Sequence, residues 1–236
     1  MLRRPRVILP NVPQHIIQRG NNRQACFYAD EDYLSYLEWL KEYAEKTDCK
    51  IHAYVLMTNH VHLLVSTEKA EAVGAMMKAL GQRYVQYINK MYKRTGTLWE
   101  GRYKSCPTQA ETYLLACQRY IELNPVCANM VSHPAEYRWS SYAVNAQGAK
   151  PEREDGEIVT PHPLYQALGA DDASRQAAYR ELFRAQLDIG VVDEIRKATN
   201  GNYALGNALF VQQIEEALGR RVTAGKAGRP KLLNTA

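Results

Sequence analysis

The sequence has little phenylalanine, no long apolar run and no CxxC pair of cysteines. Three phenylalanines stand against sixteen tyrosines, so a functional tyrosine has to be identified by its position rather than by its type. No segment approaches the roughly 20 apolar residues of a membrane span, and no signal peptide is recognisable. The five cysteines are odd in number and form no motif. These absences predict a protein of the reducing cytoplasm with no membrane partner.

Acidic residues are absent from both ends of the chain. Residues 1–29 contain five arginines, and residues 219–236 contain five lysines and arginines. A third basic segment lies around residues 90–104, and the whole chain carries a formal net charge of +5. Basic clusters of this kind predict a polyanionic partner. Solvated surface and unstructured ends would produce the same pattern, so charge alone does not decide between the two.

The hydrophobic pattern predicts seven elements in the order strand, helix, strand, strand, helix, strand, helix. The strands are expected at 14–20, 50–58, 60–66 and 98–105, and the helices from 30, at 70–93 and at 109–123. The second and third strands are joined by Thr58-Asn59 and should form a hairpin, and Gly101 should bend the last strand. The first six of these elements match an α+β fold with a ferredoxin-like split β-α-β core, an antiparallel sheet and helices on one face.

The chain is expected to divide into two parts with a linker between them. Residues 1–145 form the first domain, which begins with a basic N-terminal arm. Residues 146–160 are charged and lack periodicity, which is typical of a linker. Residues 161–236 are helical by pattern and end in a basic tail, so they are expected to form a C-terminal helical extension. The last two helices of this extension could pack together as a helical hairpin.

The stretch TNHVHLLV, residues 58–65, places two histidines on an expected strand. Side chains at i and i+2 of a strand point to the same face, so His60 and His62 should lie side by side. Two imidazoles on one face of an otherwise apolar strand are costly in a core unless they have partners. Such a pair can bind a metal ion, but satisfied core or surface histidines are the more common explanation of the pattern.

A second group of polar side chains follows one edge of the helix expected at 109–123. Tyr113, Tyr120 and Asn124 fall within a narrow sector because 7 and 11 residues are close to whole numbers of turns. Tyr120 and Asn124 are i and i+4 and therefore neighbours on the helix surface. They could present a phenol and an amide to one site. Alternatively, Tyr120 is a half-buried aromatic and Asn124 simply ends the helix before Pro125.

Four stretches in this order resemble one known family. HIIQRGNNR, YVLMTNHVHLLV, LWEGRYKS and RYIELNPV look like the single-tyrosine HUH transposases, and specifically the branch of REP-associated tyrosine transposases. The resemblance covers roughly residues 10–145, and the closing PHPLYQALG and LGRRV segments are also similar to the extension of that branch. His60-Val61-His62 fits the His-hydrophobic-His motif. A motif of three residues is weak, but four blocks in the same order are specific.

The resemblance implies a role for each residue that matches the family motifs. His60 and His62 would bind a divalent metal ion, Mg²⁺ or Mn²⁺, and Asn124 would be the third ligand. Tyr120 would be the catalytic nucleophile, and Tyr113, which does not match, would be a packing residue. Some family members carry Gln at the last ligand position; because Asn is shorter, the helix has to approach the metal more closely here.

DNA binding is expected from the basic segments and from the turn after the first strand. The stacking aromatics that single-stranded DNA requires could be Tyr28, Trp99 or Tyr103. The expected DNA-binding residues are Arg4, Arg19, Asn22, Arg23, Arg102, Lys104 and Arg229.

The resemblance implies metal-dependent nicking and rejoining of single-stranded DNA through a 5′-phosphotyrosine. The expected substrates are hairpins formed by REP-like palindromes. A monomer is expected because the extension is long, with a dimer as the alternative. Two other readings stay open: a non-catalytic DNA-binding protein with the same fold, and a metal-dependent nucleic-acid hydrolase in which Tyr120 is structural.

Overall fold

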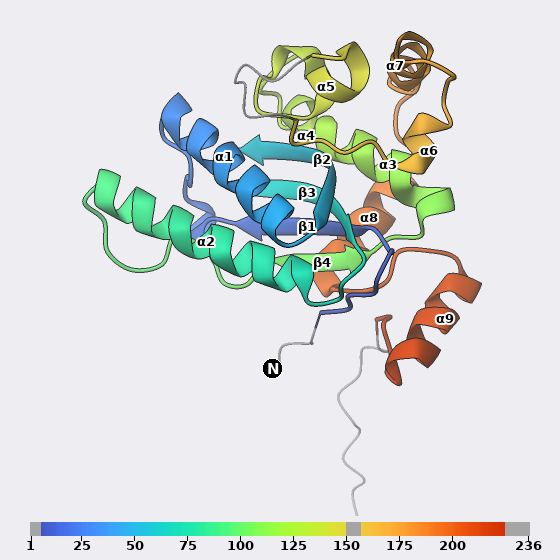
Figure 1. Ribbon diagram of the computed structural model, residues 1–236, viewed down its shortest axis with the longest axis horizontal. Helices are drawn as coiled ribbons and strands as arrows, with labels where there is room; N and C mark the ends of the chain where they lie inside the picture. The colour runs from blue at the N-terminus through green and yellow to red at the C-terminus, as the bar shows by residue number, and fades with distance from the viewer. Residues whose placement is uncertain (1–5, 150–156, 225–236) are drawn as a thin grey trace, which may run out of the picture.

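The fold is built on a four-stranded antiparallel sheet with the strand order β2-β3-β1-β4 (Figure 1). The computed structural model describes residues 6–149 and 157–224. The strands are β1 (Gln14–Arg19), β2 (Cys49–Met57), β3 (His60–Thr67) and β4 (Lys104–Pro107). β3 pairs with β1 on one side and with β2 on the other, and β2 and β3 form the expected hairpin. The ferredoxin-like split β-α-β core predicted from the sequence is confirmed.

Helices connect the strands and continue beyond them. Two short 3-10 turns, η1 (Asn21–Arg23) and η2 (Pro134–Glu136), lie between the longer elements. The helices are α1 (Asp30–Lys46), α2 (Ala72–Met91), α3 (Ala110–Glu122), α4 (Asn124–Cys127), α5 (Tyr142–Gln147), α6 (Pro163–Gln166), α7 (Asp172–Glu181), α8 (Ile189–Gly201) and α9 (Ala208–Leu218).

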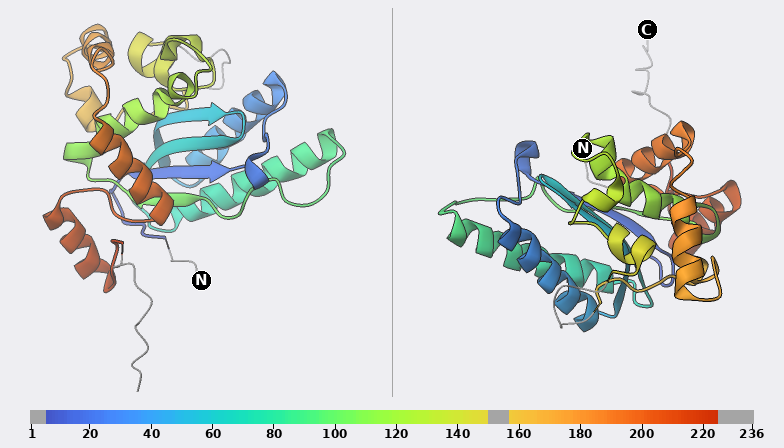
Figure 2. Two further views of the ribbon diagram at one scale, coloured as in Figure 1. Left: turned by 180° about the vertical axis from the view of Figure 1, so that it is seen from behind. Right: turned by 90° about the horizontal axis from the view of Figure 1, so that it is seen from above.

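Helices cover both faces of the sheet: the two helices of the split β-α-β core share one face, as expected, and later helices cover the other face. α1 and α2 pack on the face that carries Val61 and Leu63, and together they form the larger core. α3 and α8 pack on the opposite face, against Val55 and Leu64 (Figure 2). The physical reason can be read from β2 and β3, whose side chains are apolar on both faces and therefore need cover on both.

The last strand is shorter and lies later in the chain than expected. β4 begins at Lys104, whereas residues 98–103 form a loop in which Trp99 makes an isolated bridge to Gly20. Gly101 has a φ of 152°, a conformation that interrupts the regular strand. The bend expected at this glycine therefore ends the pairing with β1 rather than curving a continuous strand.

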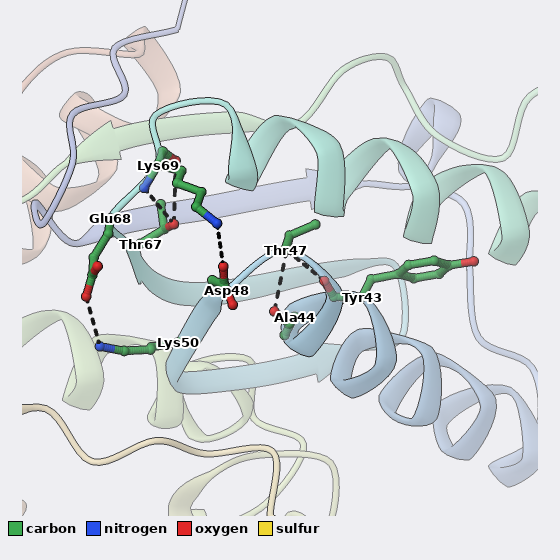
Figure 3. Close-up of polar contacts among 8 residues, drawn as sticks. All are labelled: Tyr43, Ala44, Thr47, Asp48, Lys50, Thr67, Glu68 and Lys69. Carbon is green, nitrogen blue, oxygen red and sulfur yellow. Dashed lines mark hydrogen bonds and ion pairs between the residues drawn. The ribbon is translucent and has the colours of Figure 1, made fainter.

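The end of the sheet opposite His60 is held by turns and exposed ion pairs (Figure 3). The hydroxyl of Thr47 donates to the carbonyl oxygen of Tyr43 at the end of α1, over 2.7 Å. Beyond it, Lys69 pairs with Asp48 at 2.6 Å, and Lys50 lies 3.7 Å from Glu68. Exposed pairs of this kind contribute at most about 1 kcal/mol each, so these two lysines can be replaced with little effect on the fold.

A buried carboxylate joins α3 to the helices that follow it. Glu122 accepts hydrogen bonds from Ser141 at 2.6 Å, Asn145 at 2.8 Å and Tyr179 at 2.9 Å. Its side chain is fully buried, and burial raises its pKa to about 7. Since Tyr179 belongs to α7, Glu122 connects the helix that carries Tyr120 to the C-terminal extension.

Replacing Glu122 by alanine should cost about 3 kcal/mol of unfolding free energy because three buried donors lose their acceptor. Glu122→Gln is the matched control. Its amide oxygen can still accept from Ser141 and Asn145, so the loss should stay near 1 kcal/mol. Urea unfolding followed by circular dichroism measures both values. Equal stabilities of the two variants would show that these hydrogen bonds do not hold α3 in place.

The C-terminal extension contacts the sheet directly. α8 packs on β4, β1 and α3, and its Ile195 and Ala198 belong to the same core as Leu64 and Cys117. α9 instead packs around Ile214 against Val7 and Val222. The two helices thus have different main partners and do not form the expected hairpin. The domain limits at 145 and 161 stay a prediction, and residues 150–156 of the expected linker lie outside the described residues.

The five cysteines are free thiols; four are buried and Cys127 is exposed. No helix in the part of the chain that the structure describes combines the length and the apolar character needed to cross a membrane.

Candidate active site

His60 and His62 lie at the start of β3 on the face covered by α3 and α8. In the sheet His60 stands opposite Arg19 and His62 stands opposite Ile17 of β1. The centroids of the two imidazole rings are 5.0 Å apart. His62 is buried and His60 is partly accessible. The alternation expected from TNHVHLLV therefore brings the two rings side by side.

Each of these histidines has one ring nitrogen bonded inside the protein. Nδ1 of His60 is 2.6 Å from the side-chain oxygen of Asn59, and Nδ1 of His62 is 2.8 Å from Nε2 of His15. Burial lowers the pKa of His60 to about 4, with a smaller contribution from Arg19. Burial, followed by neighbouring charges, lowers the pKa of His62 well below its usual value. Both rings are therefore neutral at physiological pH, the form that binds metal ions.

Tyr120 lies on α3 with its ring against the histidines. The centroid of its ring is 5.8 Å from that of His62 and 5.7 Å from that of His15, in both cases edge to face. Burial raises the pKa of Tyr120, and the guanidinium of Arg196 on α8 opposes this shift by lowering it. The structure thus unites Tyr120 with His62 within one chain. Tyr113 instead donates to Glu194 at 2.6 Å on the surface, which agrees with a packing role.

Asn124 is the expected site residue for which the structure records no contact with the histidines. Its amide nitrogen donates to the carbonyl oxygens of Tyr120 at 2.7 Å and Ile121 at 3.4 Å. These bonds engage the nitrogen and leave the amide oxygen as the atom available to a ligand. Among the described residues, the hydrogen bonds of Asn124 stay within its own helical segment. Its place in a metal site stays a prediction.

Pro125 does not stop the helix as completely as expected. α4 follows α3 after a single residue, Leu123, and Pro125 occupies its first turn. A proline is tolerated there because the first helical residues have no intrahelical acceptor for their N–H groups. Asn124 is therefore the first residue of α4 and does not end the helical segment.

The two imidazoles, joined by the amide oxygen of Asn124, would suit a divalent metal ion. Two neutral imidazoles and one amide oxygen leave further coordination positions open, and Mn²⁺ accepts this mixture of nitrogen and oxygen donors more readily than Mg²⁺. Within residues 6–149 and 157–224, no three His, Cys, Asp or Glu side chains form a group that could hold a metal. His15 cannot be the third ligand while its Nε2 is bonded to His62. The amide of Asn124 is therefore the residue on which such a site would depend.

A basic pocket of about 310 Å³ is lined by residues of β1, β4, the loop before β4 and the end of α8. We call it the basic pocket; its charged lining residues are Arg6, Arg19, Arg102, Lys104 and Glu100. Two of its lining residues, Ile17 and Arg19, are the β1 residues that pair with His62 and His60 in the sheet. Lys104 donates to Asn200 at the end of α8 over 3.1 Å, so the extension contributes to the wall of the pocket.

The other residues expected to bind DNA have different positions. Asn22 and Arg23 lie exposed on η1, both with positive φ, and the carbonyl oxygen of Arg23 accepts from Asn59, the neighbour of His60. Arg4 and Arg229 lie outside the described residues. Of the expected aromatics, Trp99 and Tyr103 are buried, whereas Tyr28 is 45% exposed. Tyr28 is thus the one of the three whose ring is open to a base.

Sequence reasoning missed several residues that complete the site. His15 was visible as a histidine on the first expected strand, and the fold order places that strand beside β3. Its contact with His62, however, depends on the register of the two strands. Thr199 lies 2.8 Å from His15. Like Arg196 and Arg6, it comes from a distant part of the chain and belongs to no motif. Pattern alone could not have located them.

The fold and the site together define a class: a ferredoxin-like α+β domain with paired strand histidines facing a helix-borne tyrosine. Residues 9–124, just under half of the chain, match the model of the family described as IS200-like transposases. The match contains His60, His62, Tyr120 and Asn124. Among curated proteins, none matches the chain.

Several solved structures are similar to this protein. The structure of a REP-associated tyrosine transposase bound to a REP hairpin has 14% identity and a TM-score of 0.55. The similarity covers 68% of this chain and 94% of that one, and it supports the fold. A protein from Deinococcus radiodurans has 22% identity over 51% of this chain and 96% of its own, with a TM-score of 0.37, too low to establish a shared fold.

Proposed function

We propose that this protein is a metal-dependent enzyme that nicks and rejoins single-stranded DNA through a covalent bond to Tyr120. The observation that carries the proposal is the contact between the Tyr120 ring and His62 at 5.8 Å within one chain. The matching family is one of transposases, which supports a chemistry that cuts and joins DNA. A phenol beside two neutral imidazoles supplies a nucleophile and two metal-ligating groups at one place.

The reaction would conserve the energy of the phosphodiester bond. The phenol oxygen of Tyr120 forms a bond to phosphorus while the bond from phosphorus to the 3′-oxygen breaks, and the leaving oxygen takes up a proton. The products are a 5′-phosphotyrosine and a free 3′-hydroxyl. Attack by another 3′-hydroxyl reverses the step and joins strands without a nucleotide cofactor. A bound Mg²⁺ or Mn²⁺ would act as a Lewis acid toward the scissile phosphate.

The residues of this chain would prepare the nucleophile and hold the strand. Phenol has a pKa near 10, and burial raises it further at Tyr120, which disfavours phenolate. The guanidinium of Arg196 acts in the opposite direction and favours the phenolate needed for attack. The basic pocket beside His60 offers cations for the neighbouring phosphates.

Hairpin DNA is the proposed substrate class, and a monomer is the proposed active form. The similar REP-associated transposase is bound to a REP hairpin, which supports REP-like palindromes as the partner. A monomer is supported by the site itself, since Tyr120 and His62 of the same chain are in contact and no second copy is needed to unite them. α8 occupies the surface of the sheet beside this site.

The proposal is tested with 3′-labelled single-stranded hairpin DNA and Mn²⁺. The label stays on the fragment that carries the 5′-phosphate, so wild-type protein should give a labelled adduct that survives SDS, and EDTA should prevent it. A cleaved product with a free 5′-phosphate and no adduct would favour the hydrolase reading instead. Hairpin binding without cleavage would favour a non-catalytic DNA-binding protein, and cleavage unaffected by EDTA would remove the metal from the account.

The basic pocket should account for part of the DNA affinity. We expect the double variant Arg102→Ala, Lys104→Ala to bind the hairpin roughly tenfold more weakly and to make the slope of log K against log salt less negative by about 2, roughly one unit per lost phosphate contact. Fluorescence anisotropy over a salt series measures both. Lys50→Ala, Lys69→Ala removes the same charge at the other end of the sheet (Figure 3) and should leave the slope unchanged. Equal slopes in the two double variants would exclude the pocket from DNA binding.

A further inference from the structure

A buried chain of hydrogen bonds runs from α8 to His62. The hydroxyl of Thr199 donates to the carbonyl oxygen of Ile195 over 2.8 Å. The same oxygen lies 2.8 Å from Nδ1 of His15, and Nε2 of His15 lies 2.8 Å from Nδ1 of His62. Thr199, His15 and His62 are at most 3% exposed. Water therefore cannot take the place of any partner, and the protons in the chain have few possible positions.

The direction of this chain follows from the single proton of the threonine hydroxyl. Because Thr199 donates that proton to Ile195, its oxygen can only accept from His15. Cys106, whose sulfur is 3.3 Å away, can donate into the second lone pair of the same oxygen. The two imidazoles are buried, and a charge would be costly there, so each carries one proton. His15 then holds its proton on Nδ1 and accepts at Nε2, which requires His62 to donate from Nδ1.

We propose that Thr199 and His15 are positioning residues that hold the proton of His62 on Nδ1, leaving the lone pair of Nε2 free as a ligand atom. The use of that lone pair for a metal rests on the proposed function. If Thr199 donated to His15 instead, the chain would reverse and His62 would carry its proton on Nε2, where it could not bind a metal. The carbonyl oxygen of Ile195, by accepting the Thr199 proton, sets the direction of the hydrogen bonds that leaves Nε2 of His62 unprotonated.

The tautomer of His60 is fixed in the same way, by a different part of the polypeptide. The amide nitrogen of Asn59 donates to the carbonyl oxygen of Arg23 over 3.0 Å, which orients the amide oxygen toward Nδ1 of His60 at 2.6 Å. This oxygen is an acceptor, so His60 also carries its proton on Nδ1 and offers Nε2. The tautomer of one histidine thus depends on the hairpin turn and that of the other on the C-terminal extension. This difference provides an internal control.

Long-range ¹H–¹⁵N spectra of the metal-free protein distinguish the two tautomers of each histidine. We expect Nδ1–H for both His60 and His62 in the wild-type protein. Thr199→Val keeps the shape of the side chain but removes the hydroxyl. His62 should then populate both tautomers while His60 keeps its spectrum, which also shows that the variant is folded. Thr199→Ser restores a hydroxyl and should restore Nδ1–H at His62.

Mn²⁺ titration by calorimetry gives the second readout. Outer-shell partners of metal-binding histidines are typically worth 10- to 100-fold in metal affinity, so Thr199→Val should bind Mn²⁺ about tenfold more weakly and Thr199→Ser close to wild type. A wild-type His62 protonated on Nε2, or a Thr199→Val spectrum identical to wild type, would overturn the inference. The spectra need neither metal nor DNA, so they test this inference independently of the adduct assay. If the expected tautomers were found but no adduct formed, the proposed function would be refuted and the inference about the tautomers would stand.

Discussion

Replacing Tyr120 by phenylalanine should abolish the covalent protein–DNA adduct. The substitution removes one oxygen and keeps the ring against His62 and His15, so the fold and the metal ligands are unchanged. Without the phenol oxygen no phosphotyrosine can form, and loss of a nucleophile typically lowers the rate by at least about 10⁴-fold. The measurement is the labelled adduct on a denaturing gel, with hairpin DNA and Mn²⁺ at saturating concentrations.

Tyr113→Phe is the matched control for this prediction. Tyr113 lies on the same helix two turns earlier, and its hydroxyl donates to Glu194 at the surface rather than toward the histidines. The control variant should form the adduct at a rate within about twofold of the wild type, since loss of an exposed hydrogen bond costs little. An adduct that persists in Tyr120→Phe, or one that disappears in Tyr113→Phe, would contradict the assignment of the nucleophile.

His62→Ala should abolish cleavage while preserving hairpin binding. The substitution removes a proposed metal ligand, and the expected loss of adduct is about 10³-fold or more. Affinity for DNA arises mainly from phosphate contacts, and the proposal assigns these to the basic pocket, whose lining does not include His62. The dissociation constant should therefore change by no more than about threefold. Anisotropy and the adduct assay on the same preparation give the two numbers.

The control for this variant is His133→Ala, because His133 is exposed and lies far along the chain from the site. It should retain both binding and cleavage. If binding and cleavage fell together in His62→Ala, with a matching loss of thermal stability, the histidines would be structural. Restoration of cleavage by excess Mn²⁺ would instead show that the ligand set tolerates the loss of one imidazole.

Local pattern placed the first three strands closely because each has its own signal, but it placed the fourth strand too early. The alternation in TNHVHLLV and the Thr58-Asn59 turn were sufficient to place β2, β3 and the histidine pair. The two helices of the split core lie on one face as predicted, whereas the cover of the opposite face depends on where α3 and α8 return to the sheet. The same apolar residues of β2 and β3 already indicated burial on both faces. Composition within a strand thus carries information about layers that element order does not.

The candidate site was predictable where its residues lie within one motif and not where they meet across the fold. His60, His62 and Tyr120 were found from two short stretches, and the structure brings their rings together. His15 and Thr199 contact each other across 184 positions of sequence, and no periodicity encodes such a contact. The helical extension gave no sign that α8 would reach the histidines. Interactions of this kind depend on tertiary packing.

The central claim is a covalent bond between Tyr120 and the 5′-phosphate of cleaved DNA, and mass spectrometry of the trapped adduct tests it most directly. Trypsin cuts after Arg119 and Arg138, so Tyr120 becomes the first residue of the peptide 120–138, which also contains Tyr137. After nuclease digestion, fragmentation of this peptide separates the two tyrosines. The account predicts a nucleotide on Tyr120. A nucleotide on Tyr137 or on any other residue, or an unmodified peptide from cleaved complexes, would contradict it.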